Sequence, residues 1–352
     1  HMLADLLATK LFVPPTRKNQ VLRTRLVDSL NNAWQQERQL SLVCAPAGYG
    51  KTTLITEWLN SMPVKSTWLS LDQNDNDPTR FLTYLIAALG AIDKQIGAGS
   101  RAMLLSPQPL PVDVFITALI NEIAAVPERF ILVLDDYHAI RALPIHQVLA
   151  SLVDHQPPQM HLVICTREDP PLPLPRLRAR GQLMEIRQDD LRFSLEECAD
   201  FLQCCMGLPL SGEDLIALER RTEGWIAGLL LAALSMQNRD DLSGFIKTFS
   251  GSSHYILEYL IEEVFERQLP EEQDFLLKTS ILDRMSASLC DAVANRTDSR
   301  MWLERMEKSN LFIVPLDQAH SWYRYHHLFS DLLRQRLSMS GIFPENELHR
   351  AA

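Results

Sequence analysis

The sequence has little cysteine and no long uninterrupted apolar run. Its six cysteines form no Cys-x-x-Cys pair and have no histidine at zinc-ligand spacing, which argues against a disulfide-bonded or zinc-bound scaffold. No stretch approaches the roughly 18 apolar residues of a membrane span, and the first residues lack a signal-peptide pattern. We therefore expect a reduced, cytoplasmic protein that does not enter a membrane.

An excess of basic residues is also absent. The chain has 34 Lys and Arg residues against 44 Asp and Glu residues, a formal net charge of -10, and a pI near 5.5. Because neutralising phosphates requires a basic face, we do not expect this chain to bind nucleic acid by itself. Its length of 352 residues suggests two or three domains with ample material for a core.

The most informative stretch of the sequence lies at residues 45–53. An apolar run at 40–44 precedes it and an amphipathic pattern at 54–59 follows it, which predicts the strand, loop and helix of a phosphate-binding P-loop. In such a loop, glycine permits unusual dihedrals, and consecutive backbone N–H groups surround a phosphate at the positive end of a helix. The predicted nucleotide contacts are Pro46, Ala47, Gly48, Tyr49, Gly50, Lys51, Thr52 and Thr53.

Three of these residues have more specific predicted roles. Lys51 would place its charge near the β and γ phosphates, the Thr52 hydroxyl would bind Mg²⁺, and Thr53 would lie near the α phosphate. Ala45 stands where the full pattern has glycine, so we expect the first turn of the loop to be built differently. The alternative interpretation is a glycine-containing loop with a chance Lys-Thr pair.

A second motif ends a longer apolar run. Residues 130–134 are apolar and lead into Asp135 and Asp136, as expected of a strand that is buried on both faces of a parallel sheet and opens into a ligand crevice at its carboxyl end. We predict that Asp135 holds Mg²⁺, partly through water, and that Asp136 orients the attacking water. The alternative is a solvated turn.

The same format recurs about one βαβ unit later. The apolar run at 161–165 is followed by Thr166 and Arg167. Because a planar guanidinium suits phosphate oxygens, we predict that Arg167 senses the γ phosphate, although it could be an ordinary surface arginine. The alternation of strand and helix patterns up to residue 192 predicts an α/β domain with a parallel, doubly wound sheet.

Patterns in the remaining segments predict the other elements. Prolines at 14 and 15 predict an extended arm at 9–17, and the glycine and proline content of 97–111 predicts a loop. From a Ser-x-x-Glu capping box at Ser194, nearly everything to 269 is predicted to be helical, and a hairpin at 311–325 after a helix suggests a winged helix. The expected domains are an N-terminal arm (1–20), a P-loop nucleotide-binding domain (21–192), a helical domain (193–268), a winged-helix domain (269–338) and the start of a truncated helical-repeat sensor region (339–352).

Two features keep more than one interpretation. Gly224 and Gly228 stand at a predicted helix start, where glycine lowers helix stability unless something packs closely. That close neighbour could be the nucleotide base, or the glycines could serve tight helix packing. His326 and His327 follow the aromatic hairpin, a place where histidines usually serve the core or a helix cap, and a zinc site would need further ligands.

Several motifs in the correct order resemble one protein family. The chain resembles the signal-transduction ATPases with numerous domains (STAND), and within them the MalT-like, large ATP-binding LuxR-type transcription activators. Alanine at the position of Ala45 is common in that family. The resemblance covers nearly the whole chain and is carried by residues 10–15, 45–54, 68–72, 135–138, 166–167, 190–193, 222–225 and 323–329.

This resemblance implies roles that the spacing of residues could not give. In related ATPases, an arginine at the position of Arg167 contacts the γ phosphate, and a winged-helix histidine matching His326 contacts the β phosphate of ADP. The N-terminal arm, including Val13 and Pro14, would enclose the adenine. Full-length members continue into helical repeats that bind an inducer and a DNA-binding helix-turn-helix, so we expect this chain to be an N-terminal fragment whose last residues, 347–352, begin those repeats.

The predicted function is an ATP/ADP-dependent molecular switch. ADP would hold a closed resting form, ATP with Mg²⁺ would favour self-association, and slow hydrolysis would reset the switch. Inducer and DNA would bind regions outside this chain. Two alternatives remain: a P-loop enzyme acting on a second substrate, such as a kinase or a remodelling ATPase, and a nucleotide-binding scaffold without turnover.

Overall fold

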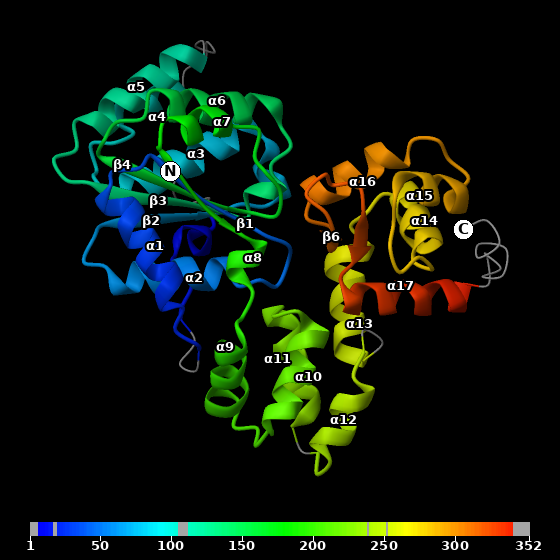
Figure 1. Ribbon diagram of the computed structural model, residues 1–352. Helices are drawn as coiled ribbons and strands as arrows, with labels where there is room; N and C mark the ends of the chain where they lie inside the picture. Colours follow the sequence, from blue (N-terminus) through cyan, green and yellow to red (C-terminus); the bar gives the residue numbers. More distant parts are fainter. Residues whose placement is uncertain (1–5, 17–19, 105–111, 238, 251–252, 341–352) are drawn as a thin grey trace. The chain divides into compact units, whose positions relative to one another are not determined.

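The chain forms two compact units, shown in the computed structural model of Figure 1. The structure describes residues 6–16, 20–104, 112–237, 239–250 and 253–340. Unit 1 contains the N-terminal arm, Leu22–Ala45 and Lys51–Asp190, whereas unit 2 contains Pro46–Gly50 and the residues from Leu191 onward. The central residues of the predicted P-loop, 46–50, thus belong to unit 2 by their contacts, whereas Ala45 and the P-loop residues from Lys51 onward belong to unit 1.

Unit 1 is built on a five-stranded, fully parallel sheet with the strand order β2-β3-β4-β1-β5. This confirms the predicted α/β fold with a parallel sheet. The elements of unit 1 are the 3-10 helix η2 (Ala8–Leu11), α1 (Thr24–Gln35), β1 (Leu40–Cys44), α2 (Lys51–Ser61), β2 (Ser66–Ser70), the 3-10 helix η3 (Gln73–Asn76), α3 (Pro78–Gly90), α4 (Ala98–Leu104), α5 (Val112–Ala124), β3 (Phe130–Asp135), the 3-10 helix η4 (Tyr137–Ala139), α6 (Leu143–Asp154), β4 (Met160–Thr166), α7 (Leu174–Ala179) and β5 (Leu183–Arg187), and the short α8 (Gln188–Leu191) runs into unit 2.

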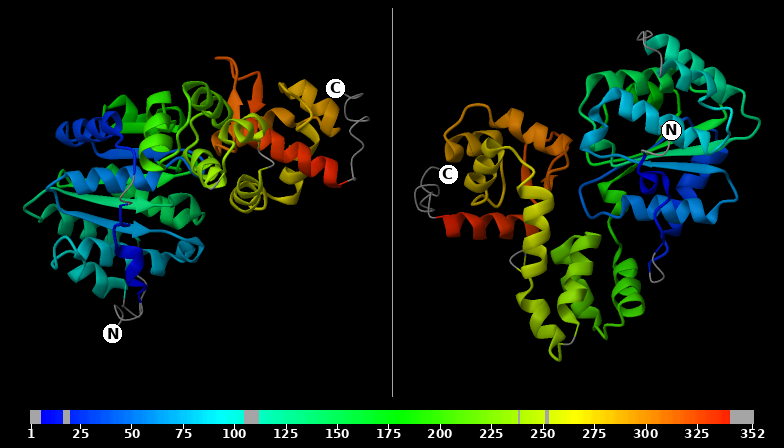
Figure 2. Two further views of the ribbon diagram at one scale, coloured as in Figure 1. Left: turned by 90° about the horizontal axis from the view of Figure 1, so that it is seen from below. Right: turned by 180° about the vertical axis from the view of Figure 1, so that it is seen from behind.

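Helices cover both faces of the sheet. In Figures 1 and 2, α3, α5 and α6 lie on one face and α1 and α2 on the other. Strands β1, β3 and β4 are buried along their whole length, which explains why their sequences are largely apolar. On the α1 and α2 face, the buried His161 ring lies 5.9 Å from the Trp34 ring and 6.1 Å from the Trp58 ring, between centroids.

The strand order brings the ends of three strands together. Strands β3, β4 and β1 are consecutive neighbours, with Leu134 opposite Ile164 and Cys44 opposite Thr166. Because the strands are parallel, their carboxyl ends lie at one edge of the sheet. The residues that follow these strands, including Asp136 after β3 and Arg167 after β4, therefore emerge near the start of the P-loop.

Two local predictions in unit 1 are wrong. The arm is not extended throughout, because Ala8–Leu11 forms the 3-10 helix η2; the prolines restrict only the residues around 14 and 15. Lys10 is buried there and pairs with Asp72 at 2.9 Å and with the fully buried Asp75. The tertiary ion pair, which local sequence does not reveal, holds this turn in place.

The segment predicted as a loop at 97–111 begins with a helix, α4. The carboxylate of Glu122 accepts hydrogen bonds from the backbone N–H groups of Gly97, Gly99 and Ser100, at 2.7, 2.8 and 3.1 Å. These donors would otherwise be unsatisfied at the start of a helix. A cap supplied from α5, more than 20 residues away, therefore stabilises a helix that its own sequence does not predict.

In the part of unit 2 that the structure describes, the regular elements are helices together with an antiparallel hairpin, in which Ile313 pairs with Tyr325, and Met285 forms an isolated bridge to Tyr323. Ser194 forms the predicted capping box with Glu197, so both of these predictions are confirmed. The boundaries of the five predicted domains stay predictions, and residues 347–352 lie outside the described residues. The elements of unit 2 are α9 (Leu195–Ala199), the π-helical turn η5 (Asp200–Cys205), α10 (Gly212–Thr222), α11 (Ile226–Met236), α12 (Leu242–Thr248), α13 (His254–Leu260), the π-helical turn η6 (Ile261–Phe265), α14 (Pro270–Thr279), α15 (Ala287–Ala294), α16 (Ser299–Lys308), β6 (Ile313–Pro315), β7 (Tyr323–Tyr325) and α17 (His327–Ser340).

Candidate nucleotide-binding site

The loop at 46–50 has the backbone of a phosphate-binding turn. It follows the buried strand β1 and leads directly into α2. Gly48 and Gly50 have φ angles of 78° and 74°, in the left-handed region that L side chains rarely adopt. Pro46, Ala47 and Tyr49 are buried. The loop therefore needs its two glycines for conformational reasons that the sequence pattern predicted.

Two predicted Mg²⁺ ligands lie side by side in unit 1. The hydroxyl of Thr52 is 3.0 Å from Oδ2 of Asp135 and 3.2 Å from Oδ1. Mg²⁺ prefers hard oxygen ligands and is usually bound by one or two carboxylates together with phosphates and waters. A hydroxyl next to a single buried carboxylate fits that preference, so these residues could hold the ion.

The two carboxylates at the end of β3 have different environments. Asp135 is buried, and burial together with the nearby charge of Asp136 raises the pKa of its carboxyl to about 6. Asp136 has a left-handed φ of 57°, its side chain is 53% exposed, and its N–H donates to Asp135 at 3.1 Å. A cation beside Asp135 would favour its ionised form.

Lys51 and Arg167 act on each other through their charges. Lys51 is buried at the start of α2, and its Nζ donates to the carbonyl oxygen of Ala45 at 2.8 Å. Burial, followed by the positive charge of Arg167, lowers the pKa of the Lys51 ammonium. Two neighbouring cations at this edge of the sheet are a suitable environment for a polyphosphate.

The other residues of unit 1 that we predicted to contact the nucleotide are Thr53, Val13 and Pro14. Thr53 is exposed on α2. Val13 and Pro14 are half-buried in the arm after η2. Their assignment to the α phosphate and to the adenine stays a prediction.

His326 is completely buried in unit 2. Its Nε2 lies 3.0 Å from the carbonyl oxygen of Thr222. Because a carbonyl only accepts hydrogen bonds, Nε2 carries the proton in the neutral ring. Nδ1 is buried and has no hydrogen-bond partner within the described part of the chain. Burial lowers the pKa of the imidazole to about 4.

Sequence reasoning gave no role to Glu223 and Arg324. The Glu223 carboxylate accepts two hydrogen bonds from the Arg324 guanidinium, at 2.8 and 2.9 Å, and a third from the N–H of His327 at 3.2 Å. Both residues belong to motifs that carried the family resemblance. Their occurrence in these two motifs was the only available signal, since the pairing spans 101 residues.

Trp225 was also missed, although it touches the loop itself. Its Nε1–H donates to the carbonyl oxygen of Ala47 at 3.0 Å. Its ring centroid lies 5.9 Å from that of His326 and 5.3 Å from that of Phe312. Phe312 in turn contacts Tyr49, with ring centroids 6.5 Å apart. An aromatic cluster of unit 2 therefore lies directly on the P-loop.

The close surroundings of positions 224 and 228 explain why both residues are glycines. A Cβ on Gly224 would lie 2.6 Å from the carbonyl oxygen of Phe193, and one on Gly228 would lie 2.6 Å from the Trp225 ring. Gly224 also has a left-handed φ of 68°. Close packing, one of the two open interpretations, accounts for both glycines.

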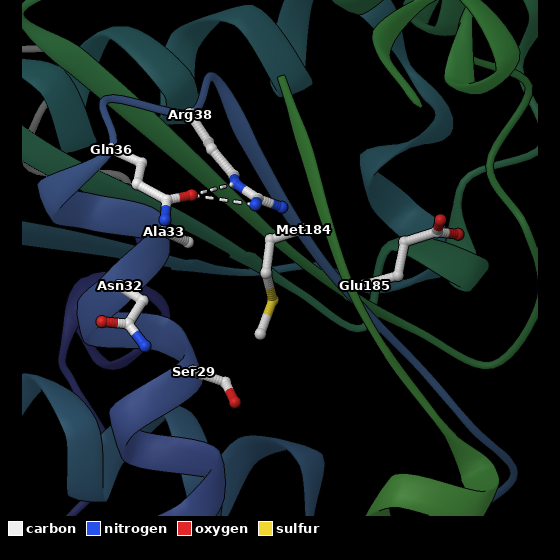
Figure 3. Close-up of a pocket in the computed structure, with 7 residues that line it drawn as sticks. All are labelled: Ser29, Asn32, Ala33, Gln36, Arg38, Met184 and Glu185. Atoms are coloured by element: carbon white, nitrogen blue, oxygen red, sulfur yellow. Dashed lines mark hydrogen bonds between the residues drawn. The ribbon is translucent and has the colours of Figure 1, made fainter. Parts of the chain in front are cut away.

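A hollow of about 340 Å³ between α1 and β5 is not part of this site. Figure 3 shows Arg38, Gln36 and Met184 among its lining residues. Arg38 precedes β1, so the hollow lies toward the amino ends of the strands, away from the edge where the P-loop begins.

The fold of the chain is that of the P-loop NTPases. A Walker-type ATPase of Pyrococcus abyssi superposes with a TM-score of 0.61 over 91% of this chain and 97% of its own chain. The sequence identity is 15%, so this likeness concerns the fold alone. No helix in the described ranges is both long and apolar enough to cross a membrane.

Sequence comparisons identify more specific relatives. Residues 261–342 match the MalT winged helix domain, which confirms the predicted winged helix. The chain is 35% identical over 349 residues to the HTH-type transcriptional regulator MalT of Klebsiella pneumoniae subsp. pneumoniae, and 34% identical to that of Cronobacter sakazakii. Each match covers 99% of this chain and 38% of the relative. The predicted resemblance to MalT-like regulators is confirmed, and the chain spans under two fifths of their length.

Proposed function

We propose that this chain is the nucleotide-dependent switch of a MalT-like transcription regulator and binds ATP or ADP with Mg²⁺ at the loop between β1 and α2. The observation that carries the proposal is His326, a fully buried side chain whose Nδ1 has no partner among the described residues. Leaving a buried polar atom unsatisfied costs about 1–3 kcal/mol. A ligand that engages this nitrogen would recover part of that cost.

ADP would hold the resting state. His326 would contact its β phosphate, while the backbone of Pro46–Gly50 and the ammonium of Lys51 surround the same group. His326 directly precedes α17 of the winged helix. One nucleotide would thereby link the P-loop to the winged helix, and the position of Trp225, in contact with both the loop and His326, supports this arrangement.

ATP would favour a second state. Arg167 would contact the γ phosphate, and Thr52 and Asp135 would hold Mg²⁺, with Asp136 orienting water for a slow hydrolysis that resets the switch. A ligand shifts a conformational equilibrium only by its different affinities for the two states. Two residues that respond to different phosphates, His326 and Arg167, supply such a difference, and we expect the ATP state to self-associate.

The remaining parts of this function concern the whole protein. The relatives are named as HTH-type transcriptional regulators, and the net charge of -10 makes this chain a poor reader of DNA. We therefore propose that DNA and an inducer bind other regions of the protein, and that the protein acts in the cytoplasm.

Nucleotide binding is tested by denaturing the purified chain and identifying released nucleotide by chromatography. We expect about one ADP per wild-type chain and none in Lys51→Ala. A protein that is empty, and that does not bind added ATP or ADP in a titration, would contradict the proposal.

The switch is tested by light scattering after gel filtration in ADP and in ATP with Mg²⁺. Wild type should be monomeric in ADP and larger in ATP, and His326→Ala should self-associate in both. The matched control is His327→Ala, because that neighbouring side chain is 61% exposed. If His326→Ala behaves like wild type, the closing role of His326 is wrong.

The two alternative functions give different results in the same assays. A P-loop enzyme with a second substrate should hydrolyse ATP much faster when a small acceptor or a protein substrate is added. A scaffold without turnover should bind ATP, release no phosphate over hours, and keep one oligomeric state in both nucleotides.

A further inference from the structure

Two donors at the start of α11 hold two consecutive carbonyl groups of the P-loop. The indole Nε1–H of Trp225 donates to the carbonyl oxygen of Ala47, and the backbone N–H of Ala227 donates to that of Gly48, both at 3.0 Å. All of these residues belong to unit 2. The carbonyl groups of the loop are therefore bound by the first residues of a helix that lies more than 170 residues away in the sequence.

These two contacts fix the direction of two peptide planes. No peptide bond in the described ranges is cis, and in a trans peptide the C=O and N–H groups point in opposite directions. With the Ala47 carbonyl turned toward Trp225, the N–H of Gly48 points away from it. The Ala227 contact turns the N–H of Tyr49 in the same way. Aligned backbone N–H groups of this kind form the anion-binding concavity of a P-loop.

The missing side chain of Gly48 makes the contact possible. A Cβ on Gly48 would lie 2.5 Å from the Cβ of Ala227 and 2.7 Å from Nε1 of Trp225, and a Cβ on Gly50 would lie 3.0 Å from Ile226. The loop therefore needs its glycines for the approach of α11 as well as for their dihedrals.

The packing around Trp225 holds its indole N–H in one orientation. Trp225 is fully buried, and its backbone N–H donates to the carbonyl oxygen of Thr222 at 2.9 Å. Its ring lies against Gly228 and has Phe312 and Tyr259 as aromatic neighbours, 5.3 and 5.7 Å away between centroids. A donor held in one orientation fixes its partner without a further entropy cost on ligand binding.

We propose that Trp225 is a positioning residue that orients the diphosphate-binding amides of the P-loop from outside, and so makes nucleotide affinity depend on the helical segment. The inference rests on the proposed nucleotide binding. It predicts that losing the indole donor weakens ligands that carry a diphosphate, although the indole N–H donates to the loop and not to the ligand.

The test compares Trp225→Phe with wild type by calorimetric titration of ADP, pyrophosphate and adenosine. Phenylalanine keeps the apolar ring and removes the N–H. We expect the Kd values for ADP and pyrophosphate to rise about three- to tenfold, the effect of one net hydrogen bond, and the Kd for adenosine to stay unchanged. An unchanged Kd for ADP would overturn the inference.

Trp302→Phe is the matched control. Trp302 also lies in unit 2, is largely buried, and donates its Nε1–H to Asp298 at 3.1 Å while stacking on Phe275. Its substitution removes the same donor elsewhere and should leave all three affinities unchanged. An equal loss in both variants would show a general structural effect and overturn the positioning role.

A second variant and a ligand-free measurement complete the test. Ala227→Pro removes the other donor at a first-turn position where proline is tolerated, and should weaken ADP and pyrophosphate in the same direction; Glu213→Pro, at the same position of α10, is its control. Hydrogen exchange of the loop amides should be faster in Trp225→Phe without any nucleotide. Unchanged exchange would overturn the positioning role, and this measurement needs no nucleotide. Failure of the wild-type chain to bind nucleotide would contradict the proposed function, so the two failures can be told apart.

Discussion

Arg324 binds Glu223 through both of its terminal nitrogens, with Nη1 2.8 Å from Oε1 and Nη2 2.9 Å from Oε2. Glu223 caps the end of α10 with a left-handed φ of 51°, and Arg324 lies in the middle of β7. The Glu223 side chain is only 7% exposed, so this planar pair is largely removed from water. It ties the helical segment to the hairpin of the winged helix within unit 2.

Glu223→Gln should destabilise the fold in a pH-dependent way. Burial opposes ionisation of Glu223, but the hydrogen bonds and charge of Arg324 prevail and lower the pKa of the carboxyl to about 2. A lowered folded-state pKa stabilises the protein above the ordinary pKa of 4.5, and this contribution disappears as pH falls from 4.5 toward 2. Urea unfolding at pH 7 should show a loss of about 2–3 kcal/mol, shrinking toward zero in acid.

Glu304→Gln is the control for that measurement. Glu304 pairs with Arg300 on the surface of α16, where both side chains are largely exposed, and such pairs contribute at most about 1 kcal/mol. If both variants lose the same stability at pH 7, the buried pair has no special role in joining the two segments.

At position 312, a glycine variant should be more stable than an alanine variant, which is the reverse of the usual order. It is a buried, bulky residue with a left-handed φ of 51°, a conformation that costs a residue with a Cβ about 1–2 kcal/mol. Phe312→Ala loses the aromatic contacts and keeps the strain, at about 3–5 kcal/mol. Phe312→Gly loses the same contacts but removes the strain, so its urea midpoint should be higher than that of the alanine variant.

The buried Phe329 provides the comparison. It lies inside α17, where glycine is less stable than alanine by about 1 kcal/mol. Phe329→Gly should therefore unfold at lower urea than Phe329→Ala. The same order at position 312 would mean that the backbone there is not strained.

The sequence predicts those elements of this protein whose conformation is determined by residues close to them in the chain. The runs that became β1, β3 and β4 were readable because strands buried on both faces are apolar throughout, and their order brought Asp135 and Arg167 to the edge where the motifs suggested. Helix α4 was missed because its cap, Glu122, comes from another helix. The contact of Trp225 with Ala47 was missed for the same reason: a pair 178 residues apart leaves no periodic signal.

Thr52→Val should separate Mg²⁺ binding from nucleotide binding. Valine has nearly the shape of threonine but no hydroxyl to face Asp135, so we expect ADP to bind normally without metal and the Mg²⁺-dependent gain in ATP affinity to fall about 10- to 100-fold. Thr52→Ser, which keeps the hydroxyl, should retain the gain. Equal Mg²⁺ dependence in the valine and serine variants would remove Thr52 from the metal site.

The same metal site should weaken in acid. Burial, and then the charge of Asp136, raises the pKa of Asp135 to about 6, so protons compete with Mg²⁺ as pH falls through that value. The Mg²⁺ concentration needed for half of the ATP response should rise below pH 6. Asp136→Asn removes the like charge and should move this rise to lower pH; an unmoved curve would show that the two carboxylates do not interact.

ADP binding should take up a proton at His326. Its Nε2–H donates to Thr222, so Nδ1 has no proton in the neutral ring, and a phosphate oxygen can only accept a hydrogen bond. Burial, and to a lesser degree Arg192 and His327, hold the pKa of the ring to about 4, while Glu223 acts in the opposite direction. Contact with the β phosphate therefore requires a second proton, which the negative charge of the diphosphate would stabilise.

The proton is counted by titrating ADP calorimetrically at pH 8 in two buffers of different ionisation enthalpy. Wild type should take up close to one proton, and its ADP affinity should fall up to about tenfold per pH unit between pH 7 and 8. His326→Gln should take up none and show a flat profile, because an amide donates without titrating. His327→Gln should match wild type. If His326→Gln and wild type take up the same number of protons, the β phosphate does not contact Nδ1, and the switch must engage the winged helix through another residue.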